Sequence, residues 1–159
     1  MKIVVFSDSH TDVETMAEAV RFERPDAIFH LGDHSSDAAA LRNLFTGIPM
    51  YAVKGNTDFD NIYPEERDLQ FEGYRILLTH GHQYGVIDYG IKELLLHGSN
   101  ENFDIVLFGH THQPFANYRS GMWFFNPGRI GKKSSKQIYA TYGVLNIEEG
   151  KIGWKFVEA

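Results

Sequence analysis

The sequence has no cysteine among its 159 residues. Disulfide bonds and thiolate metal sites are therefore excluded, and any metal ligand must be a nitrogen or oxygen atom, which favours harder ions. Positive charge is also scarce, because 21 Asp and Glu residues outnumber 15 Lys and Arg residues and leave a formal net charge of −6. Such a chain has no general attraction for nucleic acid or anionic lipid, so we expect no stable nucleic-acid complex.

Long apolar runs are missing as well. The first run, Met1 to Phe6, stops at Ser7 and Asp8, which is too short for a signal peptide, and no run approaches the length of a membrane span. We therefore predict a cytoplasmic protein without a membrane partner. The length and the 43% apolar content predict one domain over residues 1–159 with a core of its own.

The first third of the chain alternates between apolar runs and helical patterns. Buried strands are predicted at 3–6, 27–31 and 50–53 because these runs are almost entirely apolar. One helix is predicted after Thr11, which has capping-box spacing with Glu14, and a second over about 37–45. This alternation favours parallel strands joined by right-handed crossovers.

The pattern changes in the second half. Strands at 69–71 and 75–79 flank a predicted hairpin turn at Glu72 and Gly73. A helical stripe over 87–95 is predicted to stop near Gly98. The remaining apolar runs predict a buried strand and then antiparallel strands, at 105–108, 122–125, 138–147 and 152–157. Together the elements predict an α/β fold in which two sheets pack face to face with helices outside.

Seven polar residues that could bind metal follow the ends of five predicted strands. They are Asp8, His10, Asp33, Asn56, His80, His110 and His112. The carboxyl ends of strands in such a fold form a crevice, and glycines beside the candidates let the backbone turn sharply and approach closely. A set of this kind can hold two divalent ions roughly 3.5–4 Å apart, the spacing used for displacement at phosphorus. It therefore predicts metal-assisted hydrolysis of a phosphate ester.

Residue spacing suggests how these side chains meet. Residues i and i+2 of an extended segment point the same way, so we expect Asp8 and His10 to converge on one ion. By the same reasoning, we expect His110 and His112 to face one pocket.

The ordered motifs D-S-H, G-D, G-N-x-D, T-H-G-H and G-H-T-H resemble those of the calcineurin-like metallophosphoesterases, above all the small prokaryotic phosphodiesterases of the YfcE type. The F-x-N-P-G stretch from Phe124 to Gly128 is similar to their C-terminal signature. The resemblance spans Asp8 to Gly128. It implies the metallo-dependent phosphatase fold, a four-layer α/β/β/α sandwich of two mixed sheets.

The resemblance also implies a role for each candidate ligand. Asp8, His10 and His112 would bind one ion, Asn56, His80 and His110 a second, and Asp33 would bridge both. A hydroxide between the ions would attack the phosphate, and Asn56 would help to stabilise the charge on its oxygens. The family uses manganese, iron, nickel, zinc or cobalt, and we expect manganese here.

One position departs from the pattern of many family members. Where they carry a histidine after the metal-binding asparagine, this chain has Thr57. A threonine hydroxyl can donate a hydrogen bond to substrate but is not an acid at neutral pH, so the proton donor to the leaving group stays open. The small prokaryotic branch often lacks this histidine too.

Other residues near the motifs have both a functional and a structural interpretation. Asp58 could accept a hydrogen bond from a ligand imidazole or form an Asx turn. His82 could assist catalysis or be structural, and His34 could contact substrate at the pocket mouth. Arg129 begins a basic stretch that could clamp a phosphate or could be a solvated loop. The rest of this stretch is Lys132, Lys133 and Lys136.

These observations predict a binuclear phosphodiesterase acting on a small phosphate ester, with a nucleotide-like ester as one candidate. A phosphomonoesterase is one alternative. Another is a protein-interaction scaffold on the same fold, as in the retromer subunit, which lacks part of the ligand set that this chain keeps. The aromatic residues of the C-terminal half allow a homo-oligomer without showing one.

Overall fold

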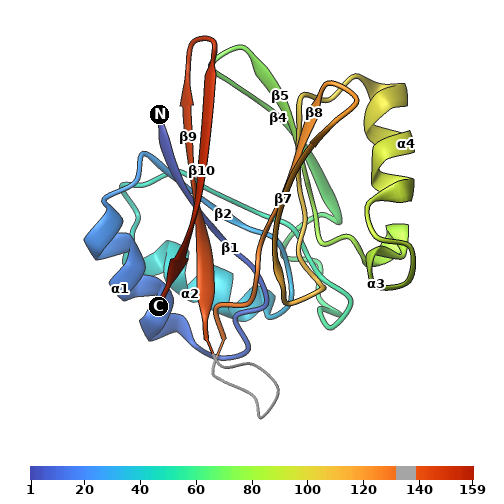
Figure 1. The fold of residues 1–159 in the computed structure, drawn as a ribbon. Helices are drawn as coiled ribbons and strands as arrows, with labels where there is room; N and C mark the ends of the chain where they lie inside the picture. Colours follow the sequence, from blue (N-terminus) through green and yellow to red (C-terminus); the bar gives the residue numbers. More distant parts are fainter. Residues whose placement is uncertain (132–138) are drawn as a thin grey trace.

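The computed structural model describes residues 1–131 and 139–159, and its framework is a pair of five-stranded sheets packed face to face (Figure 1). The first sheet contains, in order across it, β10 (Lys151–Glu158), β9 (Thr141–Glu148), β1 (Lys2–Phe6), β2 (Ala27–His30) and β3 (Met50–Ala52). The second contains, in order, β4 (Glu66–Phe71), β5 (Tyr74–Thr79), β6 (Ile105–Leu107), β8 (Met122–Pro127) and β7 (Pro114–Arg119).

Helices cover the outer face of each sheet. The first sheet carries α1 (Val13–Glu23) and α2 (Ser35–Leu44), and the second carries α3 (Val86–Tyr89) and α4 (Lys92–Glu101), with a short 3₁₀ turn at His82–Tyr84 (Figure 1). Both sheets mix parallel and antiparallel neighbours. The predicted four-layer α/β/β/α sandwich is therefore confirmed.

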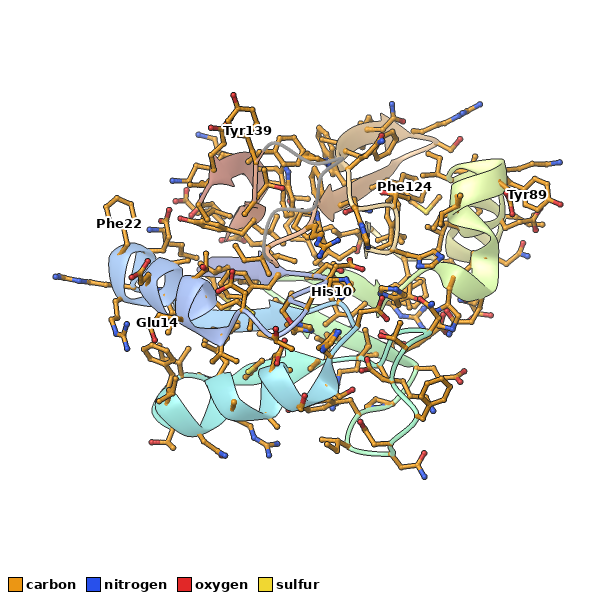
Figure 2. All side chains as sticks on the ribbon, turned by 90° about the horizontal axis from the view of Figure 1, so that it is seen from below. His10, Glu14, Phe22, Tyr89, Phe124 and Tyr139 are labelled. Atoms are coloured by element: carbon orange, nitrogen blue, oxygen red, sulfur yellow. The ribbon has the colours of Figure 1, made fainter. Side chains whose placement is uncertain are left out.

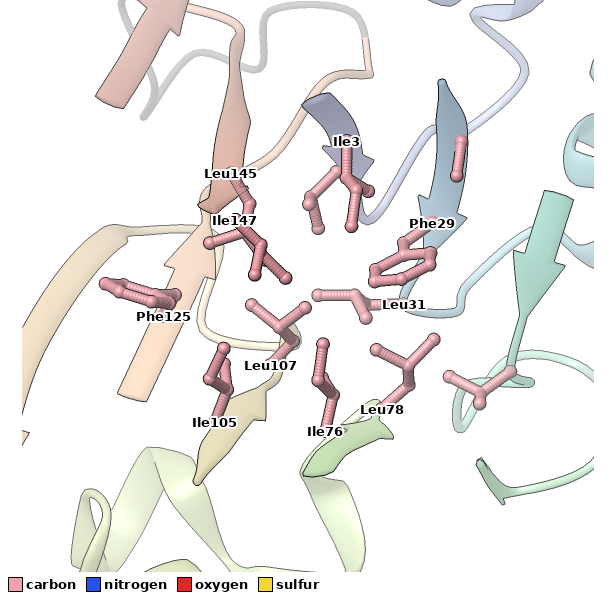
Figure 3. Close-up of a cluster of buried hydrophobic side chains, with 13 residues drawn as sticks. Ile3, Phe29, Leu31, Ile76, Leu78, Ile105, Leu107, Phe125, Leu145 and Ile147 are labelled. Carbon is pink, nitrogen blue, oxygen red and sulfur yellow. The ribbon is translucent and has the colours of Figure 1, made fainter. Parts of the chain in front are cut away.

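Three apolar layers hold the sandwich together. The central one lies between the sheets and includes Ile3, Phe29, Leu78 and Leu107 (Figure 3). A second layer packs the first sheet against α1, and a third packs the second sheet against α4. The strands of the parallel pairs are apolar on both faces because both faces are covered. In the part of the chain that the structure describes, no helix has the length and apolar character to cross a bilayer.

The predicted hairpin and the N-terminal alternation are confirmed. β4 pairs with β5 around Glu72 and Gly73, whose φ angles of 49° and 83° are both positive, as a type I′ hairpin turn requires. β1, β2 and β3 pair in parallel. The first helix, however, is capped by Asp12, which accepts from the Thr15 N–H, and not by Thr11. The second helix begins at Ser35, two residues before the predicted start.

The predicted helix over 87–98 is wrong in two respects. It is broken at Gly90, whose backbone (φ 60°, ψ −139°) separates α3 from α4. Gly98 is not the stop, because α4 continues to Glu101 and is capped by Asn102 in the left-handed conformation. Gly98 serves packing instead, since a Cβ there would lie 2.9 Å from the Met122 sulfur.

One strand was not predicted, and the strand predicted at 122–125 has a parallel neighbour as well as the antiparallel one expected. All six residues of β7 are exposed, so that strand carries no apolar pattern to detect. β7 turns the chain back, which makes β8 parallel to β6 as well as antiparallel to β7. β9 and β10 are antiparallel as predicted, and the start of that predicted region, at 138, lies outside the described residues.

Candidate metal centre

The seven candidate ligands lie on loops at one edge of the sandwich, where strands of both sheets end. Loops after β1, β2 and β3 of the first sheet carry Asp8, His10, Asp33 and Asn56. Loops after β5 and β6 of the second sheet carry His80, His110 and His112. Figure 2 shows this side of the molecule, with His10 near its centre.

The side chains gather into two clusters. Asp8, His10 and His112 form the first, and Asp33, His80 and His110 form the second. Within each cluster the candidate ligand atoms lie within 4.8 Å of one another. Asn56 adjoins the second cluster, with its Oδ1 3.1 Å from His80 Nε2.

The backbone brings the ligands together in a way that the sequence argument did not anticipate. Asp8, His10, His110 and His112 have φ angles of 56°, 43°, 68° and 61°, so neither pair lies on an extended segment. Asp8 and His10 do converge, but through tight left-handed turns. His110 and His112 are divided between the two clusters, which agrees with the assignment to two ions that the family resemblance implies.

The glycines beside the ligands allow close approach. A Cβ at Gly55 would overlap the Asp33 carboxylate, and a Cβ at Gly109 would overlap the Ser7 hydroxyl, which donates to Asp8. Only a residue without a side chain fits at these two positions. The close approach expected from the glycines is therefore present.

Protonation explains why the second cluster suits a cation. His80 Nδ1 lies 2.7 Å from the Leu31 carbonyl, which can only accept, so Nδ1 carries the hydrogen and Nε2 presents a lone pair. That lone pair faces Asn56 Oδ1 and His110 Nδ1 at 3.1 Å and Asp33 Oδ1 at 3.5 Å. These nitrogen and oxygen atoms converge on one place, where they could hold a cation.

The pKa shifts of Asp33 and His80 also indicate that the second cluster favours positive charge. Burial alone would raise the pKa of Asp33, but a hydrogen bond and positive charge from His80 and the Thr57 N–H lower it well below its usual range. Burial opposes a charged His80 ring, but the Asp33 hydrogen bond and the Asp8 and Asp33 carboxylates raise its pKa. The raised pKa of His80 and the lowered pKa of Asp33 both show that this place favours positive charge.

The first cluster has the same character. Burial would raise the pKa of Asp8, but a hydrogen bond from His112 and the charge of His80 outweigh this effect and lower it. His112 Nε2 lies 3.0 Å from Asp8 Oδ1. His10 Nε2 is buried without a hydrogen-bond partner. A buried, unpaired imidazole nitrogen beside an ionised carboxylate fits a divalent ion.

The residues predicted with two interpretations lie around these clusters. Both oxygens of Asp58 accept backbone N–H groups, from Ser35 and Gly55 at 2.8 Å, which favours a structural role, although neither bond forms the expected Asx turn. The His34 ring is 4.8 Å from the His10 ring, and the His82 ring is 5.5 Å from the His80 ring. Thr57 is exposed beside Asn56.

Arg129 lies beside the first cluster. Its charge lowers the pKa of His10, second to burial. The following residues, Ile130 and Gly131, donate backbone hydrogen bonds to the Ser7 and Asp8 carbonyls at 3.1 Å. Lys132, Lys133 and Lys136 lie outside the described residues.

Sequence reasoning missed the residues that hold the ligand loops. Asn126 is fully buried, and its amide donates to the Gly109 carbonyl at 2.8 Å and to Thr111 Oγ1 at 3.0 Å, so it fixes the loop that bears His110 and His112. The F-x-N-P-G stretch contains this asparagine and was the available signal. Asp37 and His30, which support the D-S-H loop, lie in no recognised motif.

Residues 1–150 match the family model of the calcineurin-like phosphoesterase superfamily domain. The chain therefore belongs to this superfamily, as the motifs predicted, and it has the predicted class of activity, that of a metal-dependent phosphoesterase. Membership implies divalent metal ions as cofactors, and the acid, imidazole and amide donors of the two clusters fit them.

Curated relatives agree with this placement. The probable metallophosphoesterase YsnB of Bacillus subtilis is 29% identical over 166 residues, covering 99% of this chain and 91% of the relative. Phosphodiesterase YfcE of Escherichia coli is 32% identical over 103 residues, covering 60% of this chain and 51% of the relative. The predicted resemblance to YfcE is thereby confirmed.

Solved structures share the fold along the whole chain. A predicted phosphoesterase from Streptococcus pneumoniae is 29% identical with a TM-score of 0.81, covering 99% of this chain and 88% of the other. Vps29 from Entamoeba histolytica, solved with zinc, is 20% identical with a TM-score of 0.77, covering 99% of each chain. At that identity the second likeness shows the fold alone.

Proposed function

We propose that the protein is a phosphodiesterase that works with two divalent cations. Asp8, His10 and His112 would hold one cation, and Asn56, His80 and His110 the other. Asp33 would lie between them. The observation that carries the proposal is the pair of clusters, in each of which imidazole nitrogens and a carboxylate lie within 4.8 Å of one another. We propose manganese as the metal; the nitrogen and oxygen donors permit it, as they permit iron, nickel, zinc or cobalt.

The position of Asp33 supports a bridging role. The segment before it is tied to both clusters, since the Asp8 N–H donates to the Gly32 carbonyl at 3.0 Å. On the other side, His80 Nδ1 donates to the Leu31 carbonyl at 2.7 Å. These two hydrogen bonds support the proposal that the Asp33 side chain, which follows this segment directly, would lie between the two sets of ligands.

The cations, when bound, would supply Lewis acidity and a water of lowered pKa. The chain's own residues would orient the ester: the Asn56 amide is exposed beside the second cluster and can donate to a phosphoryl oxygen. Arg129, near the first cluster, can pair with a further oxygen. Thr57 and His34 lie at the rim and would contact the ester groups. His82, whose ring lies 5.5 Å from the His80 ring, is a candidate to give a proton to the leaving group.

The substrate proposed is a small phosphate diester, including a nucleotide-like one. Because the net charge is −6, attraction for phosphate must come from the loaded centre and from Arg129, not from the surface as a whole. A homo-oligomer and a cytoplasmic location stay predictions.

Turnover of bis-nitrophenyl and mono-nitrophenyl phosphate by manganese-loaded protein tests the proposal. We expect faster turnover of the diester, loss of activity with chelator, and loss in Asp33→Ala and His80→Ala proteins that keep their circular dichroism spectrum. Preference for the monoester would identify a phosphomonoesterase. Loaded, folded protein that hydrolyses neither compound would favour the scaffold alternative, which the fold shared with Vps29 keeps in view.

A further inference from the structure

The loop that carries Asp8 and His10 has a strained backbone. Asp8, His10 and Thr11 have φ angles of 56°, 43° and 72°. Residues other than glycine seldom adopt this left-handed conformation, and they keep it only where the surroundings impose it. Some contact outside the loop must therefore hold it in the shape that brings His10 to the first cluster.

Asp37 makes that contact. Its Oδ2 accepts two hydrogen bonds at 2.7 Å, one from the Ser9 hydroxyl and one from the Thr11 N–H. These two donors flank His10 on either side. Asp37 is 6% exposed and lies in the first turn of α2, where the helix dipole favours an acceptor of negative charge.

The opposite side of Ser9 is held by His30, and the direction of each hydrogen bond can be assigned. The Gly32 N–H donates to His30 Nδ1 at 3.3 Å, so Nε2 carries the ring hydrogen and donates to the Ser9 hydroxyl at 3.2 Å. Burial lowers the pKa of His30 to about 4, which keeps the ring neutral. The Ser9 hydrogen is thus left for Asp37.

We propose that Asp37 is a positioning residue that fixes His10 as a ligand of the first cluster. This inference rests on the proposed metal-dependent function. Asp37 does not belong to either cluster of candidate ligands, and the oxygen that it turns toward the loop already accepts two hydrogen bonds. Since one oxygen accepts both bonds, an amide oxygen can replace it. The role depends on an acceptor in this place and not on the charge.

The test compares manganese binding by wild-type, Asp37→Ala and Asp37→Asn proteins, using calorimetry for stoichiometry and affinity and electron paramagnetic resonance for the coupled manganese pair. We expect two ions in the wild type. In Asp37→Ala, one ion should bind as before and the other about 10- to 100-fold more weakly, with loss of the coupled signal. Asp37→Asn should bind both ions with the wild-type affinity and show the coupled signal.

Asp12→Ala is the matched control. It removes another aspartate that accepts a backbone N–H beside the same loop, at the start of α1, but leaves the contacts to Ser9 and Thr11 in place. It should lower thermal stability without changing the manganese stoichiometry. Ser9→Ala serves as a second variant if Asp37→Ala does not fold, and it should weaken one ion in the same way.

Each outcome bears on a separate claim. Two ions bound with wild-type affinity by Asp37→Ala, or by Ser9→Ala where that variant replaces it, would overturn the positioning role alone. So would equal defects in the Asn and Ala variants of Asp37, because they would assign the effect to charge. Wild-type protein that binds no manganese would overturn the proposed function and, with it, this inference.

Discussion

Replacement of Lys2 by methionine is expected to destabilise the protein, because Lys2 neutralises a buried carboxylate. Glu23, whose side chain is 3% exposed, has Lys2 Nζ at 2.6 Å and Lys155 Nζ at 3.4 Å. Breaking a buried ion pair from one side costs about 3–5 kcal/mol, whereas exposed pairs contribute about 0.2–1 kcal/mol. Lys2 is 34% exposed and Lys155 remains, so solvent screening reduces the expected loss to about 2 kcal/mol.

Urea unfolding and thermal melts measure this loss, which corresponds to a fall in Tm of roughly 4–8 °C for a domain of this size. A double-mutant cycle with Glu23→Gln isolates the pair, and Lys2→Met should cost little in that background. Arg21→Met is the control, because Arg21 pairs with Glu14 at 3.1 Å but both side chains are more than half exposed. Its cost should stay under about 0.5 kcal/mol.

The pH dependence has a defined sign. Burial raises the pKa of Glu23, but the hydrogen bond from Lys2 and the charges of Lys155 and Lys2 outweigh it, so the pKa in the folded protein lies below 4.5. The pair therefore stabilises the fold above pH 4.5, and its contribution disappears as the pH falls through the lowered pKa. Equal loss at pH 7 and at pH 3, or equal cost with and without Glu23, would refute the reasoning.

Two further predictions concern the metal centre. Asn126→Ala should weaken manganese binding about 10- to 100-fold, because the loop bearing His110 and His112 loses its two hydrogen bonds to the buried Asn126. Calorimetry measures the affinity. As a control, Asn117→Ala on the exposed strand β7 should leave the affinity unchanged. Manganese affinity should also fall as the pH is lowered through the raised pKa of His80, since the metal must displace that proton. Titrations in buffers of different ionisation enthalpy should detect proton release, and its absence at pH 6 would contradict this protonation scheme.

The parts of the fold that could be predicted are those with a strong local pattern. Buried parallel strands are apolar throughout, so β1, β2 and β6 were recognisable, and each marked the loop that follows it. β7 was missed because it is exposed along its length, and the break at Gly90 interrupts an apolar stripe that otherwise reads as one helix. Gly98 was misread as a stop because its packing against Met122 is a tertiary contact.

The candidate metal centre can likewise be divided into parts that the local sequence pattern predicts and parts that depend on tertiary contacts. The ligand residues and their glycines could be found because the motifs place them directly after strands. The left-handed turns at Asp8, His10, His110 and His112 could not, since the backbone angles of these residues depend on contacts with other loops. The supporting roles of Asp37 and Asn126 could not be predicted for the same reason. Their partners are distant in the chain or carry no pattern, and only the folded arrangement gives them a role.

Each of the two clusters takes ligands from both sheets. Asp8 and His10 of the first sheet meet His112 of the second, while Asp33 meets His80 and His110 across the same seam. A bound cation would thus crosslink the two sheets, because neither sheet alone carries all the ligands of either cluster. Separated fragments carrying only one sheet each should be unable to retain the ions, and loading should raise the resistance of the intact chain to unfolding.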